Sequence, residues 1–120
     1  MDVERFLEAA RAVSGFSTHP DYKIGCILVR KGRVISIGWN KNKTHPYIFR
    51  NSRGVTVHAE IDALIHATTK AADTAIVYRS TAGGDRAMAR PCPMCMAALL
   101  DFGVKRVIYT IMGGFSIERI

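Results

Sequence analysis

The stretch Arg90-Pro91-Cys92-Pro93-Met94-Cys95 decides how the rest of this chain must be arranged. Cys92 and Cys95 at the opening of a helix share one face of it, because residues i and i+3 are neighbours on a helical surface. Pro91 and Pro93 suit a helix start, where a missing backbone N–H costs nothing. The unpaired N–H groups and the positive end of the helix dipole favour thiolate over thiol. The stretch therefore predicts half of a zinc site, with both sulfur atoms pointing the same way.

The remaining groups of such a site lie upstream, in Val57-His58-Ala59-Glu60. His58 offers a neutral nitrogen ligand, and with Cys92 and Cys95 it makes three protein ligands. That number leaves one tetrahedral position for water, which is the arrangement of a catalytic rather than a structural zinc. Glu60, two residues past His58, does not share its helical face. We expect Glu60 to handle protons instead of binding the metal.

Length and composition predict a single domain spanning residues 1–120, with an apolar fraction of 48% that supports a real core. A chain this short buries a modest share of its surface, so we expect a homo-oligomer. No apolar run approaches the ~18 residues of a membrane span, and the charged N-terminus does not read as a signal peptide. With two of the three cysteines assigned to a metal, we predict a cytoplasmic protein with no membrane partner.

The net charge of +7 is unevenly distributed. The segment between Tyr22 and Val57 contains no acidic residue, and its cations are Lys23, Arg30, Lys31, Arg33, Lys41, Lys43, Arg50 and Arg53. These cations could form a solvated basic face, or they could attract a phosphate-bearing partner, either a nucleotide or a single-stranded nucleic acid. Because the basic segment runs directly into His58, we favour a phosphate-bearing substrate. Tyr47 and Phe49 are the only aromatic residues from Lys41 to Val57 that could stack on bases, so we rank a mononucleotide ahead of a nucleic acid.

The hydrophobic pattern predicts alternating helices and strands. Cys26 lies in an apolar strand, where packing is its expected role. The expected helices run from Asp2 to about Ser14, from His58 to about Lys70, and from Pro93 to Phe102 with Gly103 as the C-terminal cap. The expected strands are Lys23 to Arg30, Arg33 to Asn40, Thr74 to Ser80 and Arg106 to Ile111, with a short last segment from Phe115 to Ile120. We therefore predict an α/β fold with three α/β/α layers around a mixed sheet of four to five strands.

His-x-Glu followed by Pro-Cys-x-x-Cys is the zinc deaminase signature. On these motifs the chain resembles the cytidine deaminase-like superfamily from its first helix to Ile111, and within it small deoxycytidylate (dCMP) deaminase-type proteins. The resemblance implies the cytidine deaminase-like fold, a zinc ion held by His58, Cys92 and Cys95, and Glu60 as the proton shuttle. It implies hydrolytic conversion of the cytosine base of a nucleotide to uracil, most simply dCMP to dUMP, with release of ammonia.

The same resemblance suggests residues for the substrate. Gly38-Trp39-Asn40 is similar to a Gly-aromatic-Asn motif whose asparagine holds the substrate sugar, although Asn40 could instead cap a strand end and Trp39 could pack in the core. The Ala59 N–H is a candidate holder of the base. Lys43 and His45, in the long segment Lys41 to Val57, are candidate phosphate or sugar contacts, and a structural loop contact is the alternative for His45.

Two other functions stay open at this stage. Bacterial tRNA adenosine deaminases share Gly-Trp-Asn and His-Ala-Glu-Ile with this chain, which keeps cytosine or adenine in single-stranded DNA or RNA as a substrate. A catalytically idle, zinc-stabilised nucleotide-binding domain is the third possibility. Glu60 argues against it, because a structural zinc has no use for a proton carrier. For Arg79 and Arg90, contact with a phosphate and a surface salt bridge are equal alternatives.

Overall fold

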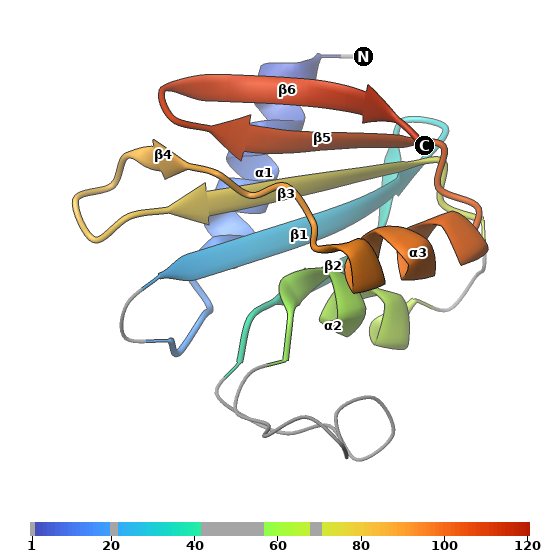
Figure 1. Cartoon of the computed structure of the whole chain (residues 1–120), viewed down its shortest axis with the longest axis horizontal. Coiled ribbons are helices and arrows are strands. Elements are labelled where there is room, and N and C mark those ends of the chain that lie inside the picture. The colour runs from blue at the N-terminus through green and yellow to red at the C-terminus, as the bar shows by residue number, and fades with distance from the viewer. Residues whose placement is uncertain (1, 20–21, 42–56, 68–70) are drawn as a thin grey trace.

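The computed structural model describes residues 2–19, 22–41, 57–67 and 71–120. In these ranges helices flank a single sheet (Figure 1). The helices are α1 (Val3–Ser14), α2 (Ala59–His66) and α3 (Pro93–Asp101). The strands are β1 (Lys23–Arg30), β2 (Arg33–Trp39), β3 (Thr74–Ser80), β4 (Arg86–Ala87), β5 (Arg106–Ile111) and β6 (Gly114–Arg119). Lys43 and His45, the two predicted loop contacts, lie outside the described residues.

The sheet is mixed, as predicted, and its strand order is β2-β1-β3-β5-β6. Only the central pair β3 and β5 is parallel; the neighbouring pairs are antiparallel. With the short β4 paired to the end of β3, the sheet has six strands, one more than the upper limit predicted. The extra strand, β4, has only two residues, which is too short to show an alternating pattern of apolar and polar residues in the sequence. The last segment forms the edge strand β6 because Gly113, at φ 73°, closes a tight turn after β5.

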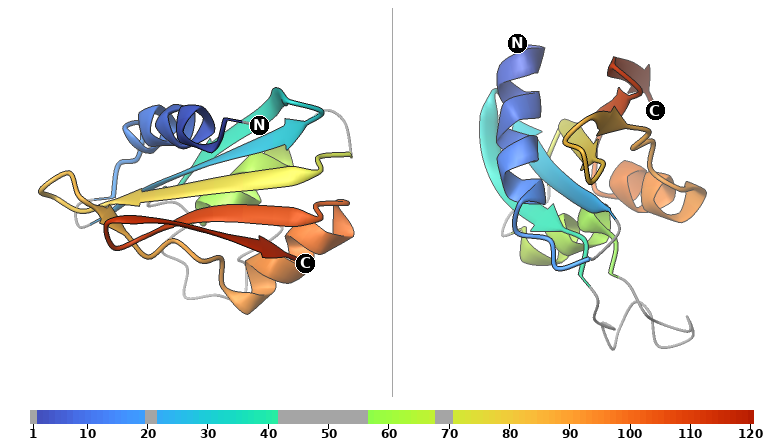
Figure 2. Two further views of the ribbon diagram at one scale, coloured as in Figure 1. Left: turned by 90° about the horizontal axis from the view of Figure 1, so that it is seen from above. Right: turned by 90° about the vertical axis from the view of Figure 1, so that its left-hand side faces the viewer.

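The helices cover both faces of the sheet, which confirms the three-layer arrangement (Figure 2). On one face, α1 buries Leu7, Ala10 and Val13 against β1 and β3. On the other face, α2 and α3 pack on a second cluster that contains Leu28, Val77, Leu99 and Val107. None of the helices in the described ranges is long and apolar enough to cross a membrane.

The distance between α2 and the sheet depends on Gly38 in β2. A Cβ atom built on Gly38 would lie 2.3 Å from the backbone nitrogen of Ala63 and 2.5 Å from the carbonyl oxygen of Ala59. Only a residue without a side chain lets the α2 backbone come this close to the strand. The helix itself ends at His66, earlier than the predicted Lys70, because Ala67 already has an extended backbone (φ −71°, ψ 129°). The close contact places the N-terminal end of α2 beside that of α3.

Candidate metal centre

The three predicted zinc ligands lie at the N-terminal ends of α2 and α3. His58 and Cys92 are the residues that precede these helices, and both have an extended backbone there. Cys95 lies in the first turn of α3. The Nδ1 atom of His58 is 3.3 Å from Cys95 Sγ and 3.8 Å from Cys92 Sγ, and the three ligand atoms lie within 4.8 Å of one another. In a tetrahedral site with ordinary Zn–S and Zn–N bonds, ligand atoms are about 3.6–3.8 Å apart. The three side chains could therefore hold a zinc ion with little rearrangement.

The backbone before α3 is held in place by β5. The N–H of Ala89 donates to the carbonyl oxygen of Thr110 at 2.9 Å, which keeps the segment that leads to Cys92 alongside the sheet. The carbonyl oxygens of Cys92 and His58 then accept the first helical hydrogen bonds, from Met96 at 2.8 Å and Asp62 at 3.0 Å. Each of these two ligands is thus fixed by its own helix, and the segment that leads to Cys92 is also held by the sheet.

Burial, not the helix dipole, controls the state of the Cys95 sulfur. Burial, with Glu60 and Cys92 close by, raises the pKa of the Cys95 thiol far above its ordinary value. Without a metal, loss of hydration therefore outweighs the partial charge of the helix end at Cys95; the thiolate predicted for the zinc-bound site stays a prediction. Burial also lowers the pKa of His58, which keeps its imidazole in the neutral form that binds metals.

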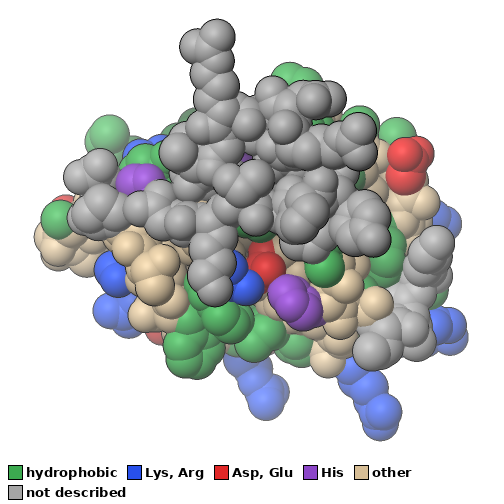
Figure 3. Space-filling view, turned by 90° about the horizontal axis from the view of Figure 1, so that it is seen from below, with side chains coloured by type: hydrophobic (Ala, Val, Ile, Leu, Met, Phe, Trp, Pro, Cys, Tyr) green, Lys and Arg blue, Asp and Glu red, His purple; other side chains and the backbone are tan. Residues whose placement is uncertain are grey.

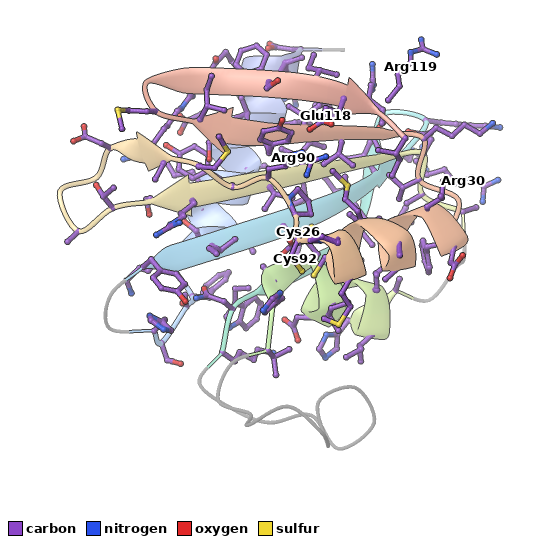
Figure 4. The ribbon with its side chains drawn as sticks, viewed as in Figure 1. Cys26, Arg30, Arg90, Cys92, Glu118 and Arg119 are labelled. Atoms are coloured by element: carbon purple, nitrogen blue, oxygen red, sulfur yellow. The ribbon has the colours of Figure 1, made fainter. Side chains whose placement is uncertain are left out.

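Glu60 lies beside these ligands and is only 5% exposed. Burial raises the pKa of its carboxyl group to about 7. A carboxyl group with such a pKa can both accept and release a proton near neutral pH. Cys26 lies in the core cluster below, together with Ala59 and Ala63, and is fully buried, so packing is its role as expected (Figure 4).

A cavity of about 470 Å³ opens between these side chains, the start of β1 and the end of β3. We refer to it as the zinc cavity. Its lining residues are Tyr22, Ile24, Asn40, His58, Glu60, Val77, Arg79, Met88, Ala89, Arg90 and Cys92. Its size falls within the usual range for small-molecule sites. Three converging metal-ligating groups, a buried carboxyl group with a pKa near 7 and a small-molecule cavity thus occur together.

Comparison with known proteins agrees with this chemistry. The family model for the cytidine and deoxycytidylate deaminase zinc-binding region matches residues 1–111. The chain belongs to this family. Zinc is therefore its cofactor, and its class of activity is hydrolytic deamination.

Curated relatives of this deaminase carry different names. It is 29% identical over 114 residues to an uncharacterized deaminase of Aliivibrio fischeri, covering 87% of this chain and 69% of the relative. It is 31% identical over 99 residues to the riboflavin biosynthesis protein RibD of Escherichia coli, covering 78% of this chain but 22% of that protein. A probable deoxycytidylate deaminase of Caenorhabditis elegans is 27% identical over 117 residues, covering 88% of this chain and 55% of the relative. The deaminase thus spans only part of several relatives that it matches.

Solved structures show the same fold. A cytidine deaminase from Burkholderia pseudomallei superposes with a TM-score of 0.72 at 23% identity, covering 99% of this chain and 93% of that one. The dCMP deaminase of cyanophage S-TIM5, solved with dCMP and dUMP, gives a TM-score of 0.58 at 25% identity, with 88% and 78% of the chains covered. These matches confirm the predicted cytidine deaminase-like fold.

Asn40, the predicted sugar contact, is 1% exposed and lines the zinc cavity of the deaminase. Its Oδ1 accepts the N–H of Ile24 at 2.9 Å, and its Nδ2 donates to the carbonyl oxygen of Tyr22 at 3.2 Å. The side chain thus ties the end of β2 to the start of β1, which is the strand-end role left open by the sequence. The other N–H of Nδ2 is the donor that could reach a substrate in the cavity. The contact between Asn40 and the substrate sugar stays a prediction.

The side chains of two other residues named with the substrate, Trp39 and Ala59, pack inside the protein. Trp39 packs against Phe16, with ring centroids 5.1 Å apart, and belongs to the core cluster on the α1 face. The packing interpretation of Trp39 is therefore correct. The Ala59 side chain is fully buried, so only its backbone N–H could meet a substrate.

Asp62 is a buried carboxylate that sequence reasoning missed. It is 3% exposed, its Oδ2 accepts the Trp39 N–H at 3.1 Å, and its Oδ1 accepts from Lys41 Nζ at 2.9 Å. His66 Nδ1 lies 3.4 Å from the same Oδ1. Acidic, basic and histidine side chains lie together among hydrophobic ones on this face of the molecule (Figure 3). Asp62 thus anchors α2, and with it His58 and Glu60, to the end of β2. An acidic residue between the apolar residues Ile61 and Ala63 was the available signal in the sequence.

The two arginines near the cysteines differ. Arg90 donates from Nε and Nη2 to the carboxylate of Glu118 in β6, at 2.6 and 3.2 Å, so it forms the salt bridge that was one alternative (Figure 4). The guanidinium of Arg79 lies 4.7 Å from the centre of the Tyr22 ring and donates from Nη1 to the Met88 carbonyl at 3.4 Å. The buried Nε of Arg79 has no hydrogen-bond partner among the described residues.

Proposed function

We propose that this chain is a zinc-dependent hydrolase that deaminates the aminopyrimidine base of a nucleotide, with dCMP as the first candidate substrate and dUMP and ammonia as its products. One observation carries the proposal. Glu60, buried and with a pKa of about 7, lines the same cavity as His58 and Cys92, beside the three converging ligand atoms. A structural zinc site would gain nothing from an ionisable carboxyl group held there at the cost of its hydration.

In this proposal the residues of the chain divide the work. His58, Cys92 and Cys95 would hold the zinc ion, which would supply an acidified water, with a pKa of ~7, as the nucleophile. Glu60 takes one proton from the water and donates it to the ring nitrogen next to the amino-bearing carbon. The water oxygen bonds to that carbon and the C–N bond breaks. Glu60 passes the second proton to the departing amine, so that one water is consumed and one ammonia released.

Arg79 supports a phosphate-bearing or otherwise oxygen-rich substrate. An unpaired buried donor costs about 1–3 kcal/mol, and the Nε of Arg79 is such a donor in the wall of the zinc cavity. A substrate oxygen that accepted this N–H would recover part of that cost on binding. The cyanophage dCMP deaminase, solved with dCMP and dUMP, supports the choice of dCMP.

A second candidate substrate has the same chemistry on another base. A diaminohydroxyphosphoribosylamino-pyrimidine deaminase of Buchnera aphidicola is 29% identical to this chain over 112 residues, and RibD proteins also match. Its substrate, by name, is an aminopyrimidine that carries a phosphorylated sugar. Both candidates therefore need the same cavity, proton shuttle and phosphate contact, and they differ in how the base is recognised.

Direct measurement of ammonia release tests the proposal. Zinc-loaded protein is given dCMP, deoxycytidine, the diaminopyrimidine phosphoribosyl substrate and a cytosine-containing oligomer at 50 and 300 mM salt. We expect turnover of a mononucleotide with modest salt dependence, and Arg79→Gln should raise KM for dCMP while changing KM for deoxycytidine little. Activity confined to the oligomer, falling steeply with salt as several phosphate contacts require, would favour the polynucleotide alternative. No turnover of any substrate would favour the idle domain.

The homo-oligomer is also part of this proposal. Helix α3 is apolar around most of its circumference, and its outward residues Met94 and Leu100 are 47% and 54% exposed. A helix that is apolar on all sides is normally buried on all sides, which supports contact with a second copy. Light scattering should give a mass above 13.2 kDa, and Leu100→Glu should lower it; a monomer at micromolar concentration would contradict this part.

A further inference from the structure

The end of the sheet far from the zinc cavity carries a second hollow, of about 370 Å³. Four cations line it: Lys31, Lys105, Arg106 and Arg119. We refer to it as the basic hollow. It opens at Thr74, where β3 begins, whereas Arg79 of the zinc cavity lies near the end of the same strand. At about 3.3 Å per residue, the two positions are roughly 16 Å apart. Figure 4 shows Arg119 and Arg30 at this end of the molecule, away from Cys92.

The sheet itself concentrates positive charge here. Arg106 of β5 is directly opposite Arg119 of β6 in the strand register, and Arg30 of β1 is directly opposite Arg33 of β2. Like charges directly opposite each other on neighbouring strands are unfavourable. Two such pairs at one end of a sheet create a local field that a bound anion would relieve.

Asp73 is the one carboxylate among the residues that line the basic hollow, and it offsets only one of the four positive charges. Asp73 accepts the backbone N–H of Lys31 on Oδ2 and the Thr74 hydroxyl on Oδ1, each at 2.8 Å. Its carbonyl oxygen accepts the backbone N–H groups of Lys105 and Arg106 at 3.0 and 3.2 Å. Asp73 therefore joins the β1–β2 turn to the segment before β5.

The cationic groups of three side chains stay available as a result. Within the described residues, no ion pair connects the side chains of Lys31, Lys105 or Arg119 to a carboxylate. Arg106 is held differently, because its Nη2 donates to the Thr74 hydroxyl at 3.3 Å. The backbone contacts thus fix the shape of the hollow, and Lys31, Lys105 and Arg119 contribute charges to its lining that none of the ion pairs among the described residues engages.

We propose that the basic hollow binds a phosphate-bearing anion, at a site separate from the zinc cavity. Guanidinium groups match the geometry of phosphate oxygens, and ammonium groups add point charges around them. The volume suits a compact group such as pyrophosphate, and the same contacts could engage consecutive phosphates of a single nucleic-acid strand. No residue of the basic hollow takes part in the proposed deamination, so the two sites can be tested independently.

Nuclear magnetic resonance titration of isotope-labelled, zinc-loaded protein locates the site. The probes are inorganic pyrophosphate and a single-stranded oligothymidylate, which has no exocyclic amine and cannot be deaminated. In 50 mM salt we expect saturable shifts at the amides of Gly32, Lys105 and Arg106. The double variant Lys105→Gln/Arg119→Gln should weaken binding of at least one probe by tenfold or more, with ammonia release from the deaminase substrate unchanged.

A matched control separates a site from general electrostatics. Arg5→Gln/Arg11→Gln removes the same charge from exposed positions of α1 and should change either affinity by less than twofold. The slope of the logarithm of oligothymidylate affinity against the logarithm of salt concentration is compared between the wild type and Lys105→Gln/Arg119→Gln. A slope that is shallower by about 1.4 in the variant identifies two contacted strand phosphates, at ~0.7 each. An effect on pyrophosphate alone identifies a compact anion. Equal weakening in both double variants, shifts centred on Tyr22 and Arg79, or no saturable binding would overturn the proposal.

Discussion

Replacing Gly38 with alanine tests whether the close contact between β2 and α2 positions the metal centre. The added Cβ would lie 2.3 Å from Ala63 N and 2.5 Å from Ala59 O, both backbone atoms of α2. Restoring an ordinary contact of about 3.4 Å requires the helix to retreat by about 1 Å. His58 and Glu60 move with α2, whereas Cys92 and Cys95 stay with α3. Zinc sites tolerate deviations of only about 0.2 Å in ligand distance.

We expect Gly38→Ala to lose about 1–3 kcal/mol of unfolding free energy, as overpacked sites do. Zinc affinity should fall, and the deamination rate should drop by about 10²-fold, because a displacement of about 1 Å at a catalytic group has such an effect. Urea unfolding, competition with a zinc chelator and ammonia release measure the three quantities on one preparation.

The matched control is Gly83→Ala in the exposed turn before β4, where the nearest atoms to an added Cβ are 3.9 Å away. This variant should behave like the wild type. If Gly38→Ala unfolds within about 0.5 kcal/mol of the wild type, the ordinary range for a harmless surface change, the steric argument is wrong. If it loses stability but keeps zinc affinity and rate, the placement of α2 does not control the site.

Three further variants test the site. Glu60→Gln should keep zinc and lose deamination by at least ~10²–10⁴-fold; turnover near the wild-type rate would exclude Glu60 as the shuttle. Burial raises the Glu60 pKa from 4.5 to about 7. The unfolding free energy of the zinc-free wild type should therefore fall as pH rises from 4.5 to about 7, by about 3 kcal/mol in all. The urea midpoint of Glu60→Gln should lack this decrease between pH 4 and 8. Cys95→Ala should lose zinc and thermal stability, and full zinc content in this variant would refute the ligand assignment. Zinc uptake by the wild type should release protons, since burial keeps Cys95 a thiol in the zinc-free protein. Asp62→Asn should cost about 1–3 kcal/mol in unfolding free energy, because it weakens a buried charged contact with Lys41, and an unchanged melting temperature would show that Asp62 does not anchor α2.

Local sequence signals were sufficient for much of this fold. The bounds predicted for β1, β3 and β5 agree with the structure, since each is a continuous apolar run between charged or polar residues. The three ligands were also predictable, because each lies within a short motif at a helix start. The end of α2 was not predictable, since no glycine or proline directly follows His66 to mark it. The edge strand β6 was expected only as a short segment, because its apolar residues Phe115 and Ile117 alternate over few positions.

Contacts between distant segments were beyond sequence reasoning, and the anchoring of the metal centre depends on them. Ser36 and Gly38 of β2 and Asn40, the residue after β2, occupy alternate positions, so they share one face of the sheet. The hydroxyl of Ser36 donates to the Ala63 carbonyl at 2.6 Å, Gly38 lets α2 approach, and Asn40 ties β2 to β1 beside the zinc cavity. Ser36 and Gly38 on one face of this edge strand thus help to set the position of α2. Since α2 carries Glu60 and directly follows His58, the spacing between the metal ligands depends on these contacts of β2 as well as on the ligand motifs.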